Sequence, residues 1–249
     1  MHISGIVSIS FRSHSPGEIL SAAATCGLSR IEWGSDVHAP KEDPDALAQI
    51  AAAQIRTPLR CCSYGTYFRL GITPLAELPD HIRAAKKLGT NHLRIWAGRK
   101  NASQYTPEER QKFLELCAAA ASIAKAHGAI LSLECHRRSY TETKEGAWEL
   151  MRHVDSPHFR MYWQPNPDIS VEENLAYIRL LRKYITHVHV FHWGGDQRLP
   201  LREGIPIWRE YLQALGGSHH LLLEFMPDDR LESLQEEADA LHELIRLCP

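Results

Sequence analysis

The sequence predicts a single (β/α)8 barrel, and three observations support this fold. Eight short apolar segments alternate with helical segments along the whole chain. The length of 249 residues is close to the roughly 250 residues of such barrels. The first apolar segment is followed by SISFRSHSPGE, which lacks the GxGxxG loop expected after the first strand of an open doubly wound sheet, the main alternative. We therefore expect one domain over residues 1–249.

The apolar segments have the length and composition of buried parallel strands. They are near-continuous runs of Val, Ile, Leu and aromatic residues and do not show the regular alternation of apolar and polar residues that is typical of half-exposed strands. In a barrel, the carboxyl ends of such strands meet at one rim, where catalytic residues are found. The eight strands are expected at residues 2–9, 29–34, 59–64, 92–98, 129–134, 159–164, 186–191 and 220–225.

The segments between the strands carry helix start signals. The longest helix is expected at about residues 107–127, and Gly128 follows it as a C-terminal cap. Three helices begin with a capping box, in which a hydroxyl side chain and a Glu three positions later satisfy the first N–H groups. These pairs are Ser15 with Glu18, Thr106 with Glu109, and Ser170 with Glu173.

Charge and cysteine usage exclude several classes of function. The formal net charge is -2, so the chain lacks the basic surplus of a nucleic-acid-binding protein. No CxxC motif occurs among the six cysteines, a pattern typical of the reducing cytosol. We find neither a secretory leader nor 18 consecutive apolar residues. The expected protein is cytoplasmic, independent of membranes and nucleic acid, and acts on a small molecule.

The stretch HVHVFHWGG, residues 187–195, places an unusual amount of imidazole at the end of a predicted strand. Side chains of a strand alternate between its two faces. His187 and His189 therefore share one face, and His192 lies on the other. Either the pair is a hydrogen-bonded part of the core, or one of its members binds a ligand.

Polar residues follow four successive predicted strands at their carboxyl ends. Two carboxylates, an amide oxygen and one imidazole form a mixed oxygen and nitrogen set that suits Mn, Mg, Co or Zn. The alternative is that the glutamates pair with Arg137 or Arg198 and the histidine is hydrogen-bonded in the core. We favour one divalent cation, with His192 and Asp168 as reserve ligands. The four predicted ligands are Glu134, Gln164, His189 and Glu224.

At these residues the chain resembles the xylose-isomerase-like TIM barrels, which include sugar isomerases and ketose 3-epimerases. The resemblance spans essentially the whole chain. It depends on LSLECH, MYWQPNPD, HVHV, RLPLREGIPIW and LLLEF. In ketose epimerases of this family the ligands are Glu, Asp, His and Glu. Gln164 therefore replaces an aspartate, which removes one negative charge from the expected site.

The resemblance implies a mechanism. The metal ion would chelate the carbonyl and adjacent hydroxyl of a small sugar, sugar acid or sugar phosphate, and Glu134 and Glu224 would exchange a proton through an enediolate. Aromatic and basic residues near the rim would bind the substrate. The predicted substrate-binding residues are Trp33, His38, Tyr64, Trp96, His136 and Arg198, and Glu32 and Tyr67 are secondary candidates.

Three alternatives to an isomerase or epimerase remain. The same enolate can expel a beta leaving group, which would make the enzyme a lyase or dehydratase. A site that has lost its metal at Gln164 would leave a non-catalytic carbohydrate-binding protein. An endonuclease IV-like repair enzyme would need more histidine and aspartate ligands than Cys61, Cys62, Tyr64 and Pro167 provide. Related barrels often form homo-oligomers, so self-association is also expected.

Overall fold

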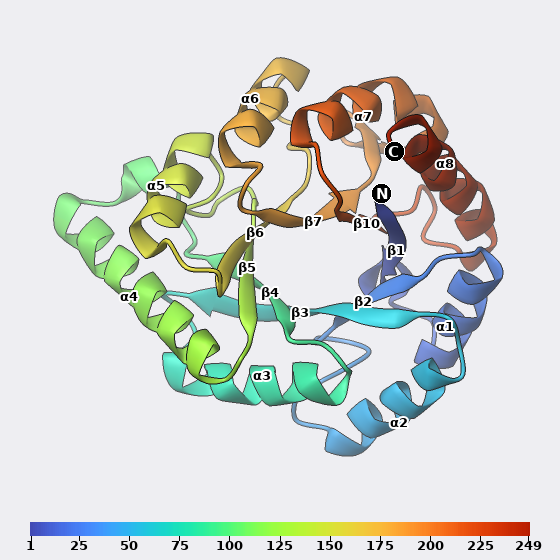
Figure 1. Cartoon of the computed structure of the whole chain (residues 1–249), viewed down its shortest axis with the longest axis horizontal. Coiled ribbons are helices and arrows are strands. Elements are labelled where there is room, and N and C mark those ends of the chain that lie inside the picture. Colours follow the sequence, from blue (N-terminus) through green and yellow to red (C-terminus); the bar gives the residue numbers. More distant parts are fainter.

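The computed structural model describes every residue from Met1 to Pro249. Eight parallel strands close into a barrel in the order β1-β10-β7-β6-β5-β4-β3-β2. Eight helices form a ring around it, as the view along the barrel in Figure 1 shows. The strands are β1 (Ile3–Val7), β2 (Arg30–Gly34), β3 (Arg60–Leu70), β4 (His92–Ala97), β5 (Ile130–Glu134), β6 (Phe159–Trp163), β7 (Ile185–Val190) and β10 (His220–Leu223).

The helices begin where the sequence predicts. All three capping boxes form, and Gly128 adopts a φ of 61° directly after α4 and its capping residue. The helices are α1 (Pro16–Thr25), α2 (Pro44–Ile55), α3 (Leu78–Lys87), α4 (Pro107–Ala126), α5 (Lys144–Val154), α6 (Val171–Leu181), α7 (Leu201–Leu215) and α8 (Leu234–Leu247). Short 3-10 turns occur at Ser8–Phe11, Leu75–Glu77, Ala102–Gln104 and Leu231–Ser233.

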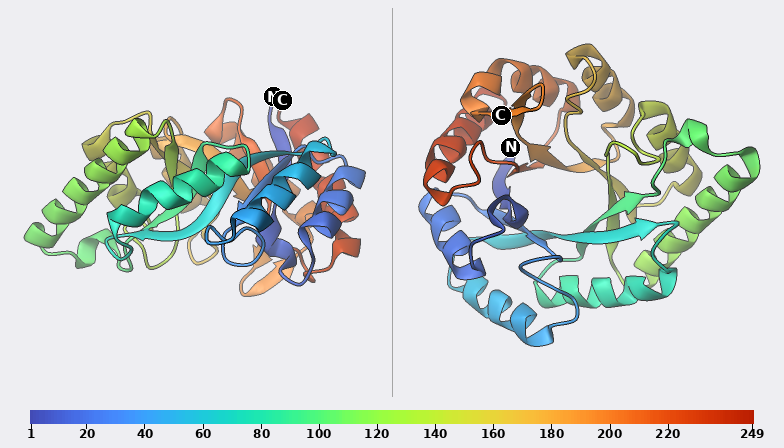
Figure 2. Two further views of the ribbon diagram at one scale, coloured as in Figure 1. Left: turned by 90° about the horizontal axis from the view of Figure 1, so that it is seen from below. Right: turned by 180° about the vertical axis from the view of Figure 1, so that it is seen from behind.

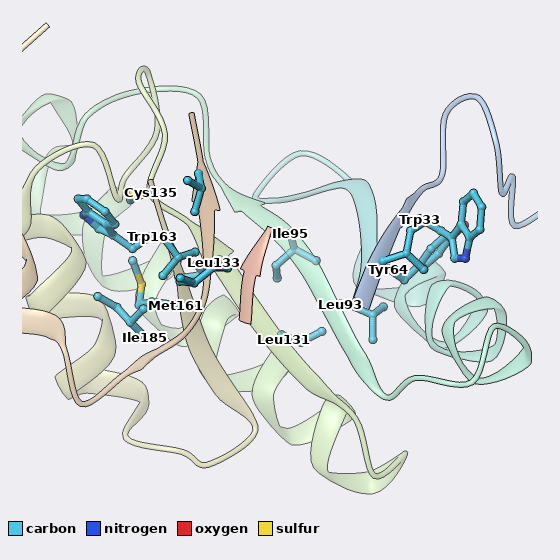
Figure 3. Packing of buried hydrophobic residues seen from close by; sticks show 14 of the residues in the cluster. Trp33, Tyr64, Leu93, Ile95, Leu131, Leu133, Cys135, Met161, Trp163 and Ile185 are labelled. Carbon is cyan, nitrogen blue, oxygen red and sulfur yellow. The ribbon is translucent and has the colours of Figure 1, made fainter. Parts of the chain in front are cut away.

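The strands have two buried faces of different character. Leu131 and Leu133 of β5 point outward into the apolar layer beneath the helices, as Figure 3 shows, whereas Ser132 and Glu134 point into the barrel. The same alternation places Arg94 of β4 inside. The outer layer forms the main core, and the inner face is free to carry polar residues. This division positions the site.

The sequence analysis did not predict a short antiparallel hairpin after β7. Its strands are β8 (His192–Gly194) and β9 (Gln197–Leu199). The termini lie close together, as both views in Figure 2 show, because β1 pairs with β10 and α8 returns beside it. No helix has the length and apolar composition that a membrane-spanning segment requires.

Candidate active site

A buried ion-pair network centred on Arg94 occupies the barrel interior toward the carboxyl ends of the strands. Arg94 lies in β4 and is 2% exposed. Its Nε donates to Glu32 Oε1 at 2.9 Å, and its Nη1 donates to Glu134 Oε2 at 2.6 Å. Burying a guanidinium group is costly unless carboxylates pair with it, as two do here. One side chain therefore joins β2, β4 and β5.

Glu134 is held by two donors on one of its oxygens. The indole N–H of Trp96 donates to Oε2, which also accepts from Arg94. Burial by itself would raise the pKa of Glu134, but the positive charge of Arg94 and that of His189 outweigh burial and lower it. The carboxylate is therefore ionised at neutral pH. Glu134 Oε1 has no hydrogen-bond partner in the protein and stays available to a ligand.

His189 lies among three oxygen-bearing side chains. Its Nδ1 is 3.2 Å from Gln164 Oε1 and 3.3 Å from Glu224 Oε2, and its Nε2 is 3.7 Å from Glu32 Oε1. Burial lowers the pKa of His189, but the carboxylates of Glu224 and Glu32 outweigh burial and raise it to about 10. In the absence of another cation, the imidazole therefore carries a proton at neutral pH.

The side chains around His189 are compatible with a divalent cation. Glu32 Oε2, His189 Nε2 and Glu224 Oε2 are buried without a hydrogen-bond partner. Ligands of an ion with bonds of about 2.1 Å lie roughly 3.0–3.4 Å apart, and the separations of 3.2 and 3.3 Å around His189 Nδ1 match this spacing. Gln164, His189 and Glu224 thus converge, and Glu134 at the end of β5 lines the same cavity as Gln164.

A cavity of about 80 Å³ adjoins this network. Glu134 and Gln164 line it together with His136, and the apolar part of its wall is mostly aromatic. A cavity with apolar walls and a few converging polar groups at the carboxyl ends of barrel strands is the expected form of an active site. Its aromatic residues are Trp163, Tyr177, Phe191, Trp193 and Phe225.

His136 is fixed in one tautomer by its surroundings. Its Nδ1 lies 2.6 Å from the carbonyl oxygen of Arg137. A carbonyl oxygen can only accept a hydrogen bond, so Nδ1 carries a proton, and in the neutral imidazole the lone pair is on Nε2. The ring stacks on Trp96, with centroids 5.1 Å apart, and lines the cavity. His136 therefore presents a proton-accepting nitrogen that no other protein group engages.

Two predicted substrate-binding residues, Trp33 and Tyr64, lie away from the cavity. They are register partners on the outer face of β2 and β3, and Figure 3 shows them together in the apolar layer. Trp33 Nε1 donates to Gln54 Oε1, and the Tyr64 hydroxyl donates to the carbonyl of Ala39. They point outward because each lies one position from the inward-facing residue of its strand. We no longer expect either to contact substrate.

His38 and Arg198 do not line the cavity either. His38 is buried, with Nδ1 3.0 Å from Ser8 Oγ and Nε2 3.1 Å from the carbonyl of His14, so it fastens two loops together. Arg198 is in β9, where it pairs with Asp229. Of the predicted substrate-binding residues, only Trp96 and His136 adjoin the network.

The network contains a residue that the sequence analysis missed. Arg94, not Arg137 or Arg198, is the arginine that pairs with Glu134, while Arg137 pairs with Asp168 across 2.8 Å. The signal was present in HLRIWAG, since an arginine in the middle of an apolar strand is costly without a buried carboxylate partner. Phe225 was also missed. It lines the cavity with a φ of 53°, an uncommon conformation for a bulky residue.

The sequence matches the family model described as the xylose isomerase-like TIM barrel over residues 20–246. The chain belongs to this family. A 3-dehydroshikimate dehydratase of Bacillus anthracis is 24% identical over 178 residues, which are 61% of this chain and 62% of that relative. The sequence match therefore spans less than two thirds of the relative's length.

Solved structures resemble the whole chain. The probable 3-DHS dehydratase AsbF from Bacillus anthracis superimposes with a TM-score of 0.77 and 20% identity, covering 97% of this chain and 99% of that one. The IOLI protein with a binding zinc atom superimposes with a TM-score of 0.79 and 15% identity, covering 100% of this chain and 99% of that one. A D-psicose 3-epimerase in the presence of D-fructose superimposes with a TM-score of 0.72 and 16% identity, covering 99% of each chain. These likenesses show the shared fold.

Proposed function

We propose that this chain is a divalent-metal-dependent enzyme that removes the proton alpha to the carbonyl group of a small polyhydroxylated compound. Gln164, His189, Glu224 and the free Oε1 of Glu134 would hold the ion. When bound, the metal supplies a Lewis acid that polarises a substrate oxygen. Arg94 and Trp96 orient Glu134 from behind, as groups that support metal ligands commonly do.

His136 is the residue that we propose as the proton acceptor. Its Nε2 has a free lone pair, and the residue lies on the cavity wall two positions after Glu134. Glu134 is less suited to this role because Arg94 outweighs burial and lowers its pKa, which makes its carboxylate a weaker proton acceptor. The expectation that Glu134 and Glu224 form the acid and base pair is therefore replaced by a single base, with Glu134 as an anchored carboxylate.

A single base favours dehydration, and this observation carries the choice of reaction. An imidazole that has accepted the alpha proton can transfer it to a beta hydroxyl leaving on the same face, so one group serves both steps and water is released. Inversion of a stereocentre needs a second proton carrier on the opposite face. The curated dehydratase relative supports the same outcome. We therefore propose a dehydratase acting on a compound of the 3-dehydroshikimate type.

The second candidate is a ketose epimerase or isomerase, and the observation that favours it is Glu224. One oxygen of this buried carboxylate has no hydrogen-bond partner. Glu224 follows β10, which lies three strands from β5 around the barrel. Glu224 would serve as the second proton carrier if the substrate lay between it and His136. Fold likeness to the D-psicose 3-epimerase is consistent with this alternative.

Parallel assays distinguish the two reactions. The chain loaded with Mn²⁺ is incubated with 3-dehydroshikimate, whose dehydration yields an aromatic acid detected by ultraviolet absorbance, and separately with D-fructose, whose epimer is detected by chromatography. We expect dehydration, and at least about a hundredfold loss of kcat in His136→Gln, because general base catalysis contributes about 10²–10⁴-fold. His153→Gln, at an exposed histidine of α5, is the matched control.

Turnover of D-fructose alone would replace the dehydratase proposal by the epimerase. Unchanged kcat in His136→Gln would exclude His136 as the base. Turnover of neither compound, with metal bound, would favour the carbohydrate-binding alternative.

A further inference from the structure

A second group of metal-ligating side chains lies inside the barrel toward the amino ends of the strands, and the proposed active site does not use it. It consists of Cys62 in β3, His187 in β7 and His220 at the start of β10. The Cys62 Sγ and one ring nitrogen from each histidine all lie within 4.8 Å of one another. His187 is the first histidine of the HVHV segment, and the proposed active site uses only the second, His189.

The imidazoles in this group have unsatisfied nitrogens. His187 is 3% exposed, and its Nδ1 is 3.0 Å from Thr186 Oγ1, whereas its Nε2 is buried without a partner. The Nδ1 atoms of His220 and of the adjacent His92 are also buried without partners. An unpaired buried polar atom costs about 1–3 kcal/mol. Two of these three nitrogens belong to the histidines grouped with the Cys62 thiol, which indicates a shared ligand.

The donor chemistry selects the kind of ion. The donor atoms are one sulfur and imidazole nitrogens, with no carboxylate among them. Soft sulfur and imidazole donors suit zinc and do not suit Mg²⁺ or Ca²⁺.

This group is separate from the candidate active site. Tyr162 stacks on His187, with centroids 4.7 Å apart, and its other neighbour is His189 at 4.9 Å. The tyrosine also packs in a small apolar cluster with Cys62 and Leu222. A layer of apolar and aromatic side chains thus lies between the two groups. An ion in one group would share no ligand with an ion in the other.

We propose that Cys62, His187 and His220, with His92 as the fourth donor, bind one structural zinc ion at the amino-terminal end of the barrel interior. Cys62, His187 and His220 are already grouped, and His92, whose ring centroid lies 5.0 Å from that of His187, would rotate toward them to complete the site. His92 and His220 are partly exposed at this end and give the ion a route of entry. On binding, the Cys62 thiol forms a sulfur–zinc bond and releases its proton to solvent. Four protein ligands leave no open position, so the ion stabilises the fold without taking part in catalysis.

Cobalt titration of the metal-free full-length chain tests this proposal. A Co²⁺ ion bound to a thiolate gives a near-ultraviolet charge-transfer band, which oxygen and nitrogen ligands at the candidate active site do not give. We expect the band in the parent chain, its loss on adding zinc, and its absence in Cys62→Ala. Cys61→Ala is the matched control, because Cys61 is an adjacent buried thiol outside the group and should leave the band intact.

A second variant covers the possibility that Cys62→Ala fails to fold. His220→Gln retains the thiol and should weaken cobalt binding about tenfold or more, with the band still visible at saturation. Zinc should raise the melting temperature of the parent chain more than that of Cys62→Ala, which retains only the proposed active-site ligands. The proposal is overturned if the parent chain shows no band, if the band survives in Cys62→Ala, or if His220→Gln binds cobalt as tightly as the parent.

Discussion

Replacing Arg94 by methionine tests the ion-pair network, since it removes the one guanidinium that joins Glu32 and Glu134. Methionine keeps most of the side-chain length but carries no charge. All three side chains are at least 95% buried, so water cannot replace the missing donor. Removing one partner of a buried pair costs about 3–5 kcal/mol because it leaves the other charge uncompensated. We expect the free energy of unfolding to fall by about this amount at pH 8.

The loss should depend on pH in a defined direction. In the parent chain, burial opposes ionisation of Glu32 but the charge of Arg94 outweighs it and lowers the pKa. The stability that this carboxylate contributes is present above its ordinary pKa of about 4.3 and disappears as the pH falls through the lower folded value. In the variant the charge of Arg94 no longer offsets burial, so the pKa values of Glu32 and Glu134 in the folded state rise. Protonation of these carboxylates at lower pH then removes the cost of burying an unpaired charge. The difference between variant and parent should shrink by about 1 kcal/mol or more from pH 8 to pH 5.

Urea unfolding of both chains at the two pH values, with a chelator present, measures these differences. Arg83→Met is the matched control. Arg83 pairs with Asp80 on the surface of α3, and an exposed pair contributes at most about 1 kcal/mol. A loss below 1 kcal/mol for Arg94→Met, or a loss of equal size at pH 5 and pH 8, would refute the argument that Arg94 compensates two buried carboxylates.

Two further substitutions probe the same region. Gln164→Asp adds a negative charge to the proposed ligand set. Mn²⁺ should therefore bind more tightly in calorimetric titration, and kcat should change. Unchanged or weaker affinity for every ion tried would show that Gln164 is not a ligand. Gly65→Ala places a methyl group 2.5 Å from Glu32 Oε1 and 2.8 Å from Arg94 Nη2; we expect a lower melting temperature and lower kcat, and Gly17→Ala, where nothing lies within 4 Å of the added atom, should affect neither.

The fold could be predicted from sequence because its signals are local and repeated. Eight apolar segments and three capping boxes fall where the structure has strands and helix starts. The hairpin β8–β9 was missed because its strands are only three residues each and lie among glycines and polar residues. A strand pair of this length has too little apolar periodicity to identify.

The site was predicted less completely because it depends on which face each side chain occupies. Glu134, Gln164, His189 and Glu224 were predicted because each lies at or near the end of a strand. In the structure Gln164 and Glu224 lie beside His189, and Glu134 lines the same cavity as Gln164. Their role as metal ligands stays a prediction. Trp33 was assigned to the substrate although the preceding residue, Glu32, is the inward one. Alternation within a strand settles such cases only when the register of the barrel is known.

Hydrogen exchange in heavy water tests the central claim, metal-dependent proton abstraction, most directly. The chain loaded with Mn²⁺ is incubated in D₂O with 3-dehydroshikimate or D-fructose, and the substrate and product are examined by NMR at the position alpha to the carbonyl. The account predicts loss of the alpha hydrogen to solvent, which stops when the metal is removed and is strongly reduced in His136→Gln. Turnover that retains this hydrogen in the product at the adjacent carbon would show a hydride shift and contradict the mechanism, as would exchange that continues without metal.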